Sequence, residues 1–273
     1  MLPREESGPG LHVAGVTVRF GGLTALDGVS LDVAPGEIVG VIGPNGAGKT
    51  TLFNAICGFV RPQGGEIAWA GQSLARVRPH RLARLGIVRT LQGVGLFKGL
   101  TVVENVMVGA EPRARAGFAS TLLGLPRSDR DERALRGRAM EMLERLGVAE
   151  VAGRLPGTLP YPVQKRVALA RALVAEPSLL LLDEPASGLG GADMESFAEV
   201  IRDLGGEVAV MLVEHHMDFV TGICSRIVVL DFGRVIASGA PTEIQADPRV
   251  LEAYLGFETT AQDEVREPEP GRA

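Results

Sequence analysis

The sequence GPNGAGKT at residues 43–50 has the residue types and spacing of a loop that binds nucleotide phosphates. In the pattern GxxxxGKS/T, the glycines let backbone N–H groups surround phosphate oxygens, the lysine neutralises the outer phosphates, and the hydroxyl binds Mg²⁺. Lys49 would hold the β- and γ-phosphates, and Thr50 would be a metal ligand. The residues that we expect to bind the nucleotide here are Gly43, Pro44, Asn45, Gly46, Ala47, Gly48, Lys49, Thr50 and Thr51.

An acidic motif far downstream supplies the carboxylates that such a loop needs. The sequence LLLLDEP at residues 179–185 predicts a buried strand that ends at Asp183, where open α/β sheets bind ligands. Phosphoryl transfer to water depends on positioning and charge neutralisation. We therefore expect Asp183 to organise Mg²⁺ and Glu184 to orient or deprotonate the attacking water. The alternatives are a chance match in a glycine-rich turn and a solvated strand end.

The elements around these motifs occur in the order that the chemistry requires. Residues 37–42 form an apolar run typical of a buried parallel strand, and residues 51–56 begin a helical pattern. Such a helix would direct its positive N-terminus at the anion. Further strands are predicted at 179–183, 208–213 and 227–231, with a helical stretch around 194–204. This order implies a wound α/β core.

Other segments predict two additions to that core. Residues 11–33 alternate apolar and polar positions between turn signals, which predicts short antiparallel strands, and residues 64–71 read as another strand. From about 92 to 159 the apolar spacing is helical, which predicts a helical insertion. Beyond residue 256 the chain becomes polar, so we expect a disordered tail.

Composition excludes several classes of protein. Of 273 residues, 45% are hydrophobic, too many for a disordered chain, yet no apolar run approaches the roughly 18 residues of a membrane span. The amino terminus lacks a secretory signal, so we expect a cytosolic chain. Cys57 and Cys224 are isolated in apolar segments, which predicts core thiols. A net charge of −5 without a basic block argues against nucleic-acid binding.

Together these motifs resemble the ATP-binding cassette (ABC) ATPases over about residues 11–256. The resemblance implies an α/β fold with a P-loop NTPase core, a mostly parallel wound sheet, an N-terminal antiparallel β subdomain and an inserted α-helical subdomain at about 93–163. It implies one domain at 11–257, disordered tails at 1–10 and 258–273, and ATP and Mg²⁺ as cofactors.

Three further residues match family positions. Phe20 falls where the family places an aromatic that stacks on adenine, Gln92 matches the glutamine that senses Mg²⁺, and His215 matches the switch histidine that contacts the γ-phosphate. Local alternatives are a core aromatic for Phe20 and a loop-capping role for Gln92. His216 competes with His215 as the switch, although register after the strand favours His215, and Glu214 could be a solvated strand end.

A narrower resemblance is to the ATPase subunits of bacterial branched-chain amino-acid importers, carried by residues 19–26, 96–106, 113–133 and 247–256. Urea and amide importers share these features. The resemblance implies an energy-coupling subunit on the inner face of the membrane, with a second ATPase, two permease subunits and an external solute-binding protein. The alternatives are a largely non-hydrolytic regulatory subunit, a soluble cassette acting on nucleic acid or cofactor assembly, and export of lipid-linked material.

The family's signature sequence, LSGGQ or LSYGQ, contacts the ATP of the partner cassette, and here it is altered. The corresponding residues are Pro160, Tyr161, Pro162, Val163 and Gln164. Proline supplies neither the serine hydroxyl nor the glycine N–H, although it suits the first turn of a helix. Gly190 also stands where the family carries Asn or Asp. We expect the helix to be kept, the partner's site to be weakened, and a heterodimer to be favoured over a homodimer.

Overall fold

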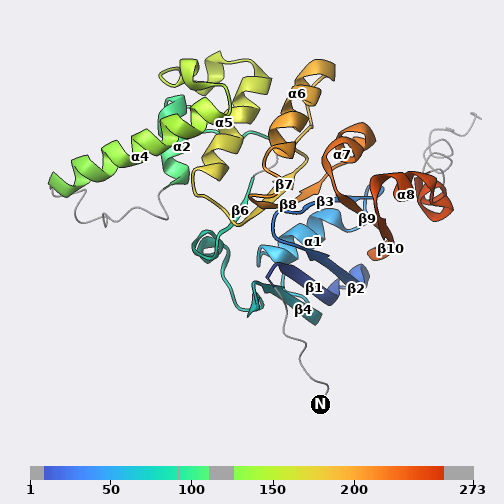
Figure 1. The fold of residues 1–273 in the computed structure, drawn as a ribbon. Helices are drawn as coiled ribbons and strands as arrows, with labels where there is room; N and C mark the ends of the chain where they lie inside the picture. Colours follow the sequence, from blue (N-terminus) through green and yellow to red (C-terminus); the bar gives the residue numbers. More distant parts are fainter. Residues whose placement is uncertain (1–8, 91–92, 111–125, 255–273) are drawn as a thin grey trace, which may run out of the picture.

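A six-stranded sheet forms the centre of the computed structural model, which describes residues 9–90, 93–110 and 126–254 (Figure 1). Its strand order is β10-β9-β3-β8-β7-β6. Within this sheet β3, β6, β7, β8 and β9 are parallel, and β10 pairs with β9 in antiparallel orientation at one edge. The strands are β3 (Ile38–Ile42), β6 (Ile87–Arg89), β7 (Leu179–Asp183), β8 (Ala209–Val213), β9 (Arg226–Asp231) and β10 (Arg234–Gly239).

The central strands are buried on both faces, which explains their continuous apolar sequences. Every residue of β3, β7 and β8 is buried. Along β3, Ile38 and Ile42 belong to one apolar cluster, whereas Val39 and Val41 belong to another on the opposite face. Parallel sheets are covered in this way because crossover helices lie on both faces. The predicted wound α/β core is confirmed.

A second, antiparallel sheet packs below the first in Figure 1. Its strand order is β2-β1-β4-β5, comprising β1 (Leu11–Phe20), β2 (Leu23–Val33), β4 (Gly64–Trp69) and β5 (Gln72–Ser73). Helix α1 (Lys49–Ile56) lies between the two sheets, and its apolar side chains share one core cluster with both. This confirms the predicted antiparallel strands.

Helices make up most of the described chain between β6 and β7, as the apolar spacing predicts. They are α2 (Val102–Gly109), α4 (Pro126–Arg145) and α5 (Tyr161–Leu173), with 3-10 turns η3 (Ala149–Val151) and η4 (Pro156–Thr158). This arm extends to the left in Figure 1. A capping box between Thr101 and Glu104 begins α2, and the buried amide of Asn105 donates to the carbonyls of Phe97, Leu100 and Thr101.

The remaining helices are α6 (Gly191–Arg202), α7 (Met217–Ile223) and α8 (Pro241–Ala246), and a 3-10 segment, η1 (Pro79–Leu85), precedes β6. Cys57 and Cys224 are buried free thiols, as predicted, and burial raises the pKa of Cys224 to about 12. In the part of the chain that the structure describes, no helix combines the length and the apolar character that a membrane span requires. Residues 1–8 and 255–273, within or beside the predicted tails, lie outside the described residues.

Candidate functional site

The phosphate-binding loop connects the end of β3 to the start of α1 and has a backbone that requires glycine. Gly43 and Gly48 have φ angles of 147° and 103°. A Cβ on Gly43 would overlap the carbonyl oxygen of Leu230, and one on Gly48 would lie 2.6 Å from the carbonyl oxygen of Ala25. The neighbouring strands therefore hold the loop tightly, and α1 begins at Lys49 with its N-terminus at the loop.

The Lys49 ammonium group lies over its own loop. Its Nζ donates to the carbonyl oxygens of Gly43 at 2.6 Å and Pro44 at 2.8 Å. Burial lowers the pKa of Lys49, and the negative charge of Glu184 partly offsets that effect. A glycine-lined cradle with a helix N-terminus and a partly desolvated cation fits a polyphosphate.

The acidic residues and the histidine pair meet this loop at the carboxyl edge of the sheet. Asp183 is the last residue of β7 and lies in register with Val213, the last residue of β8, which in turn pairs with Val41 of β3. Because the three strands are parallel, the residues that follow them share one edge. Glu184 and His215 are therefore brought near the phosphate-binding loop, as the sequence predicts.

Asp183 has a partly buried cationic partner that the sequence analysis did not identify. Arg89, at the end of β6, donates from one guanidinium nitrogen to Asp183 Oδ2 at 2.6 Å and from another to Asn54 Oδ1 on α1 at 2.7 Å. Its guanidinium carbon also lies 5.6 Å from the centre of the Phe53 ring. Arg89 thus orients the carboxylate that we expect to hold Mg²⁺. The sequence feature that could have identified Arg89 is a single charged residue at the end of a short apolar run.

Glu184 adopts a backbone conformation that L-residues rarely use. Its φ is 47°, and its N–H donates to the carbonyl of Val213 at 2.9 Å. Lys165, on α5, donates from Nζ to the carbonyl oxygens of Glu184 at 3.3 Å and Pro185 at 3.0 Å. Only 5% of Lys165 is exposed, and burial lowers its pKa. Sequence reasoning missed this lysine because nothing in its own segment shows what it contacts.

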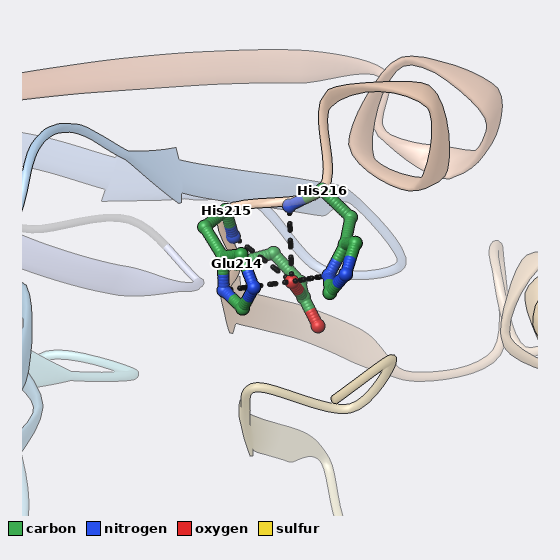
Figure 2. A group of neighbouring side chains, drawn as sticks. All are labelled: Glu214, His215 and His216. Atoms are coloured by element: carbon green, nitrogen blue, oxygen red, sulfur yellow. Dashed lines mark hydrogen bonds and ion pairs between the residues drawn. The ribbon is translucent and has the colours of Figure 1, made fainter. Parts of the chain in front are cut away.

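Glu214 is completely buried, so its interpretation as a solvated strand end is wrong. Figure 2 shows its carboxylate between His215 and His216. Oε1 accepts a hydrogen bond from the Ala186 N–H at 2.7 Å, and Oε2 accepts from the His215 and His216 N–H groups at 2.9 and 3.2 Å. The His216 ring lies 3.0 Å from Oε2 through Nδ1. A buried carboxylate needs such donors.

Glu214, His215 and His216 also place their potential metal-ligand atoms within 4.8 Å of one another. Oε2 of Glu214, however, already accepts two backbone N–H bonds and contacts the His216 ring. Hydrogen bonding therefore accounts for the cluster. The His215 side chain is 54% exposed and that of His216 35% exposed, with the rings 4.1 Å apart. His215 is the more accessible, and its switch role stays a prediction.

Two other predicted site residues have different outcomes. Phe20 ends β1 and is 51% exposed, so the core-aromatic alternative is wrong and the ring is accessible to a ligand. Gln92 lies outside the described residues. The predicted contacts of both with nucleotide and metal remain predictions.

The altered signature forms the predicted helix start. Helix α5 begins at Tyr161, with Pro160 in the N-cap position and Pro162 in the first turn, where no helical N–H is required. Gln164 donates from its side chain to the carbonyl of Leu159 at 2.9 Å, while Val163 follows in the same turn. Pro160 makes no side-chain capping bond.

Comparison with known proteins agrees with this geometry. Residues 26–187 match the family described as ABC transporter, and residues 234–256 match the family described as branched-chain amino acid ATP-binding cassette transporter. The chain is 42% identical over 252 residues to the high-affinity branched-chain amino acid transport ATP-binding proteins BraF of Pseudomonas aeruginosa and LivG of Escherichia coli K12. Each alignment covers 92% of this chain and 99% of the relative.

Solved structures give the same result. The ADP conformation of MJ1267, an ATP-binding cassette of an ABC transporter, is similar with a TM-score of 0.77 and 29% identity. The alignment covers 92% of this chain and all of that one. A post-hydrolysis dimer of the cassette MJ0796 with ADP and phosphate is similar with a TM-score of 0.70 and 26% identity, over 85% of this chain and 98% of that one.

Proposed function

The chain belongs to the ATP-binding cassette family of transporter ATPases, whose members couple ATP hydrolysis to transport, and from that premise we propose a narrower function. It is the energy-coupling subunit of a bacterial importer for branched-chain amino acids or a related small polar solute. The match of residues 234–256 and the names of the 42%-identical relatives support this solute class.

One observation carries the proposed chemistry: the phosphate-binding loop, Asp183, Glu184 and His215 meet at one edge of the sheet. Lys49 holds the outer phosphates, Glu184 orients or deprotonates the attacking water, and His215 contacts the γ-phosphate. Phe20 stacks on the adenine.

The residues at this edge also fit Mg²⁺. Thr50 and Asp183 supply the oxygen ligands that this ion prefers, with Gln92 as a third candidate. When bound, the ion neutralises charge on the phosphate oxygens. Arg89 already orients the Asp183 carboxylate through Oδ2, so this ligand is preorganised.

The proposed assembly contains two integral-membrane permease subunits, a second ATPase subunit and an extracytoplasmic solute-binding protein. The chain sits peripherally on the inner face of the membrane through the permease. Pro160 and Pro162 support a heterodimer, because they remove contacts that this chain would offer to the ATP bound by its partner. They also favour a second candidate, a largely non-hydrolytic regulatory subunit, against which the retained Glu184 and His215 argue.

The test of this function is Glu184→Gln in the complex with the second ATPase and the permease. Because the amide cannot accept the water proton, hydrolysis should fall about 10²- to 10⁴-fold while ATP affinity is kept. Glu199→Gln, the same change on the exposed face of α6, should leave hydrolysis unchanged. Wild-type hydrolysis by Glu184→Gln would exclude the proposed base and favour the regulatory alternative.

The solute is tested by reconstituting the complex with its binding protein in liposomes. Leucine, isoleucine or valine should stimulate ATP hydrolysis and accumulate inside, whereas urea should do neither. If urea stimulated hydrolysis and accumulated while the three amino acids did not, the proposed solute class would be wrong. The role of the chain as an energy-coupling subunit would be unchanged.

A further inference from the structure

We propose that Lys165 and Glu214 form a buried clamp on residues 184–186, which positions the Glu184 carboxylate and links it to the start of α5. Both are positioning residues, since Lys165 acts on the backbone of Glu184 and Pro185 and Glu214 acts on that of Ala186. The inference rests on the proposed function, in which Glu184 is the base and the start of α5 faces the nucleotide of the partner subunit.

Lys165 holds one side of this segment. Its Nζ donates to the carbonyl oxygens of Glu184 and Pro185, at 3.3 and 3.0 Å. The contact with Pro185 is buried and that with Glu184 partly buried, so an apolar side chain in place of Lys165 would leave both carbonyls without this donor. The clamp is thus a polar contact between a helix and the residues that follow β7.

Glu214 holds the other side. Its Oε1 accepts from the Ala186 N–H at 2.7 Å, and its Oε2 accepts from the N–H groups of His215 and His216. The opposite charges of Lys165 and Glu214 compensate each other in the interior, since Glu214 raises the pKa of Lys165 against the lowering by burial. One carboxylate therefore connects the base segment to the histidine segment seen in Figure 2.

The base needs such a clamp because of its backbone. Glu184 has a φ of 47°, and a non-glycine residue persists there only when surrounding contacts determine it. The Glu184 N–H bond to Val213, the two bonds from Lys165 and the Ala186 bond to Glu214 together fix three consecutive residues. Loss of one side would let the carboxylate move away from the water that it orients.

The same contacts reach the first turn of α5. The Tyr161 ring packs on Gly188, where a Cβ would come within 2.8 Å of the ring, and Lys165 Nζ lies 5.5 Å from the ring centre. A displacement at the start of α5 is thus carried to residues 184–188. Through this path, nucleotide at the partner's site would adjust the base of this subunit.

The experiment compares Lys165→Met, Lys165→Arg and Arg166→Met in the complex with the second ATPase. Arg166 is a matched control: it lies next on α5 and donates to the Leu146 carbonyl and Ser196 Oγ. For Lys165→Met, kcat should fall by about 10²-fold because a misplaced base costs about that much, while KM stays within twofold. Lys165→Arg should recover most of the rate, and Arg166→Met should keep wild-type kcat.

A second readout follows the backbone directly. Hydrogen exchange of the amides of residues 186–190 should be faster in Lys165→Met than in wild type, and unchanged in Arg166→Met. If Lys165→Met does not fold, Glu214→Gln is measured in its place. A glutamine side chain has only one oxygen, so it cannot accept all the hydrogen bonds that the two Glu214 oxygens accept. This variant should show the same loss of kcat and the same faster exchange.

Three outcomes would overturn the clamp: wild-type kcat and exchange in Lys165→Met, an equal loss in Arg166→Met, or a rise in KM without a fall in kcat. Failure of the proposed function looks different. In that case the wild-type complex does not hydrolyse ATP or Glu184→Gln hydrolyses normally, and the exchange measurements still decide whether the clamp exists.

Discussion

At the scale of single residues, the pairing of Arg89 with Asp183 is a structural requirement of the site. Asp183 is buried, and an ionised carboxylate is expensive to bury without a charged partner. Arg89 provides that partner and also bonds Asn54, so one guanidinium connects the ends of β6 and β7 with α1. The proposed metal ligand therefore keeps its position through a residue that is not among those predicted to bind the nucleotide.

Replacing Arg89 with Met should lower the free energy of unfolding by about 3–5 kcal/mol, because it leaves the Asp183 charge buried without its partner. Urea denaturation of the full chain measures this change. The matched control is Arg145→Met, which breaks an ion pair to Glu207 on the exposed surface and should cost less than about 1 kcal/mol. Equal losses in the two variants would show that the Arg89 pair is no stronger than a surface pair.

At the scale of elements, a glycine in β3 sets the distance between the central sheet and α7. A Cβ on Gly40 would lie 2.7 Å from Cγ1 of Val220 and 2.9 Å from Sγ of Cys224, both on the segment that begins just after His216. These contacts are shorter than van der Waals packing allows. The absence of a side chain at residue 40 thus lets the helix that follows the histidine pair approach the sheet.

Gly40→Ala should destabilise the protein by about 1–3 kcal/mol, since the core cannot accept the added methyl group without shifting. Gly137→Ala is the contrasting change. Gly137 lies on the exposed face of α4 with open space around it, so alanine should stabilise by about 0.5–1 kcal/mol. Chemical denaturation of both variants checks the signs, and a stabilised Gly40→Ala would contradict the packing argument.

Much of this architecture could be predicted because its signals are local. The phosphate-binding loop carries its pattern within residues 43–51, and the leucines of β7 are buried on both faces of the sheet, so their continuous apolar run was sufficient. β6 was not predicted, because it has three residues and ends in Arg89.

Lys165 and Glu214 could not be predicted as buried for a different reason. The backbone groups of residues 184–186 that they bind lie 19 to 28 residues away along the chain, although Glu214 also accepts from its neighbours His215 and His216. Only the folded arrangement brings donor and acceptor together. In the sequence alone, a charged residue with no partner nearby along the chain is assigned to the solvated surface.

At the scale of the whole molecule, the phosphate-binding edge of the sheet and the start of α5 contact different nucleotides in the proposed dimer. Lys49, Asp183 and Glu184 act on the ATP bound by this chain, whereas the start of α5 faces the ATP bound by the partner. With Pro160 and Pro162 in that turn, a homodimer would have two weakened sites and a heterodimer one intact site. The isolated chain should therefore hydrolyse ATP slowly and the mixed dimer rapidly, and strong activity of the chain alone would reject this asymmetry.

Restoring the signature by Pro160→Ser, Pro162→Gly and Val163→Gln should raise turnover of both the mixed dimer and the chain alone. In the chain alone, the restored turn completes the sites formed with its own phosphate-binding loops. The stability change should be small: serine at the N-cap contributes about 1 kcal/mol that Pro160 does not supply, and this offsets the more flexible glycine. Phosphate release and melting temperature are measured together, to separate an effect on catalysis from an effect on stability. Unchanged turnover at an unchanged melting temperature would mean that the prolines do not limit hydrolysis.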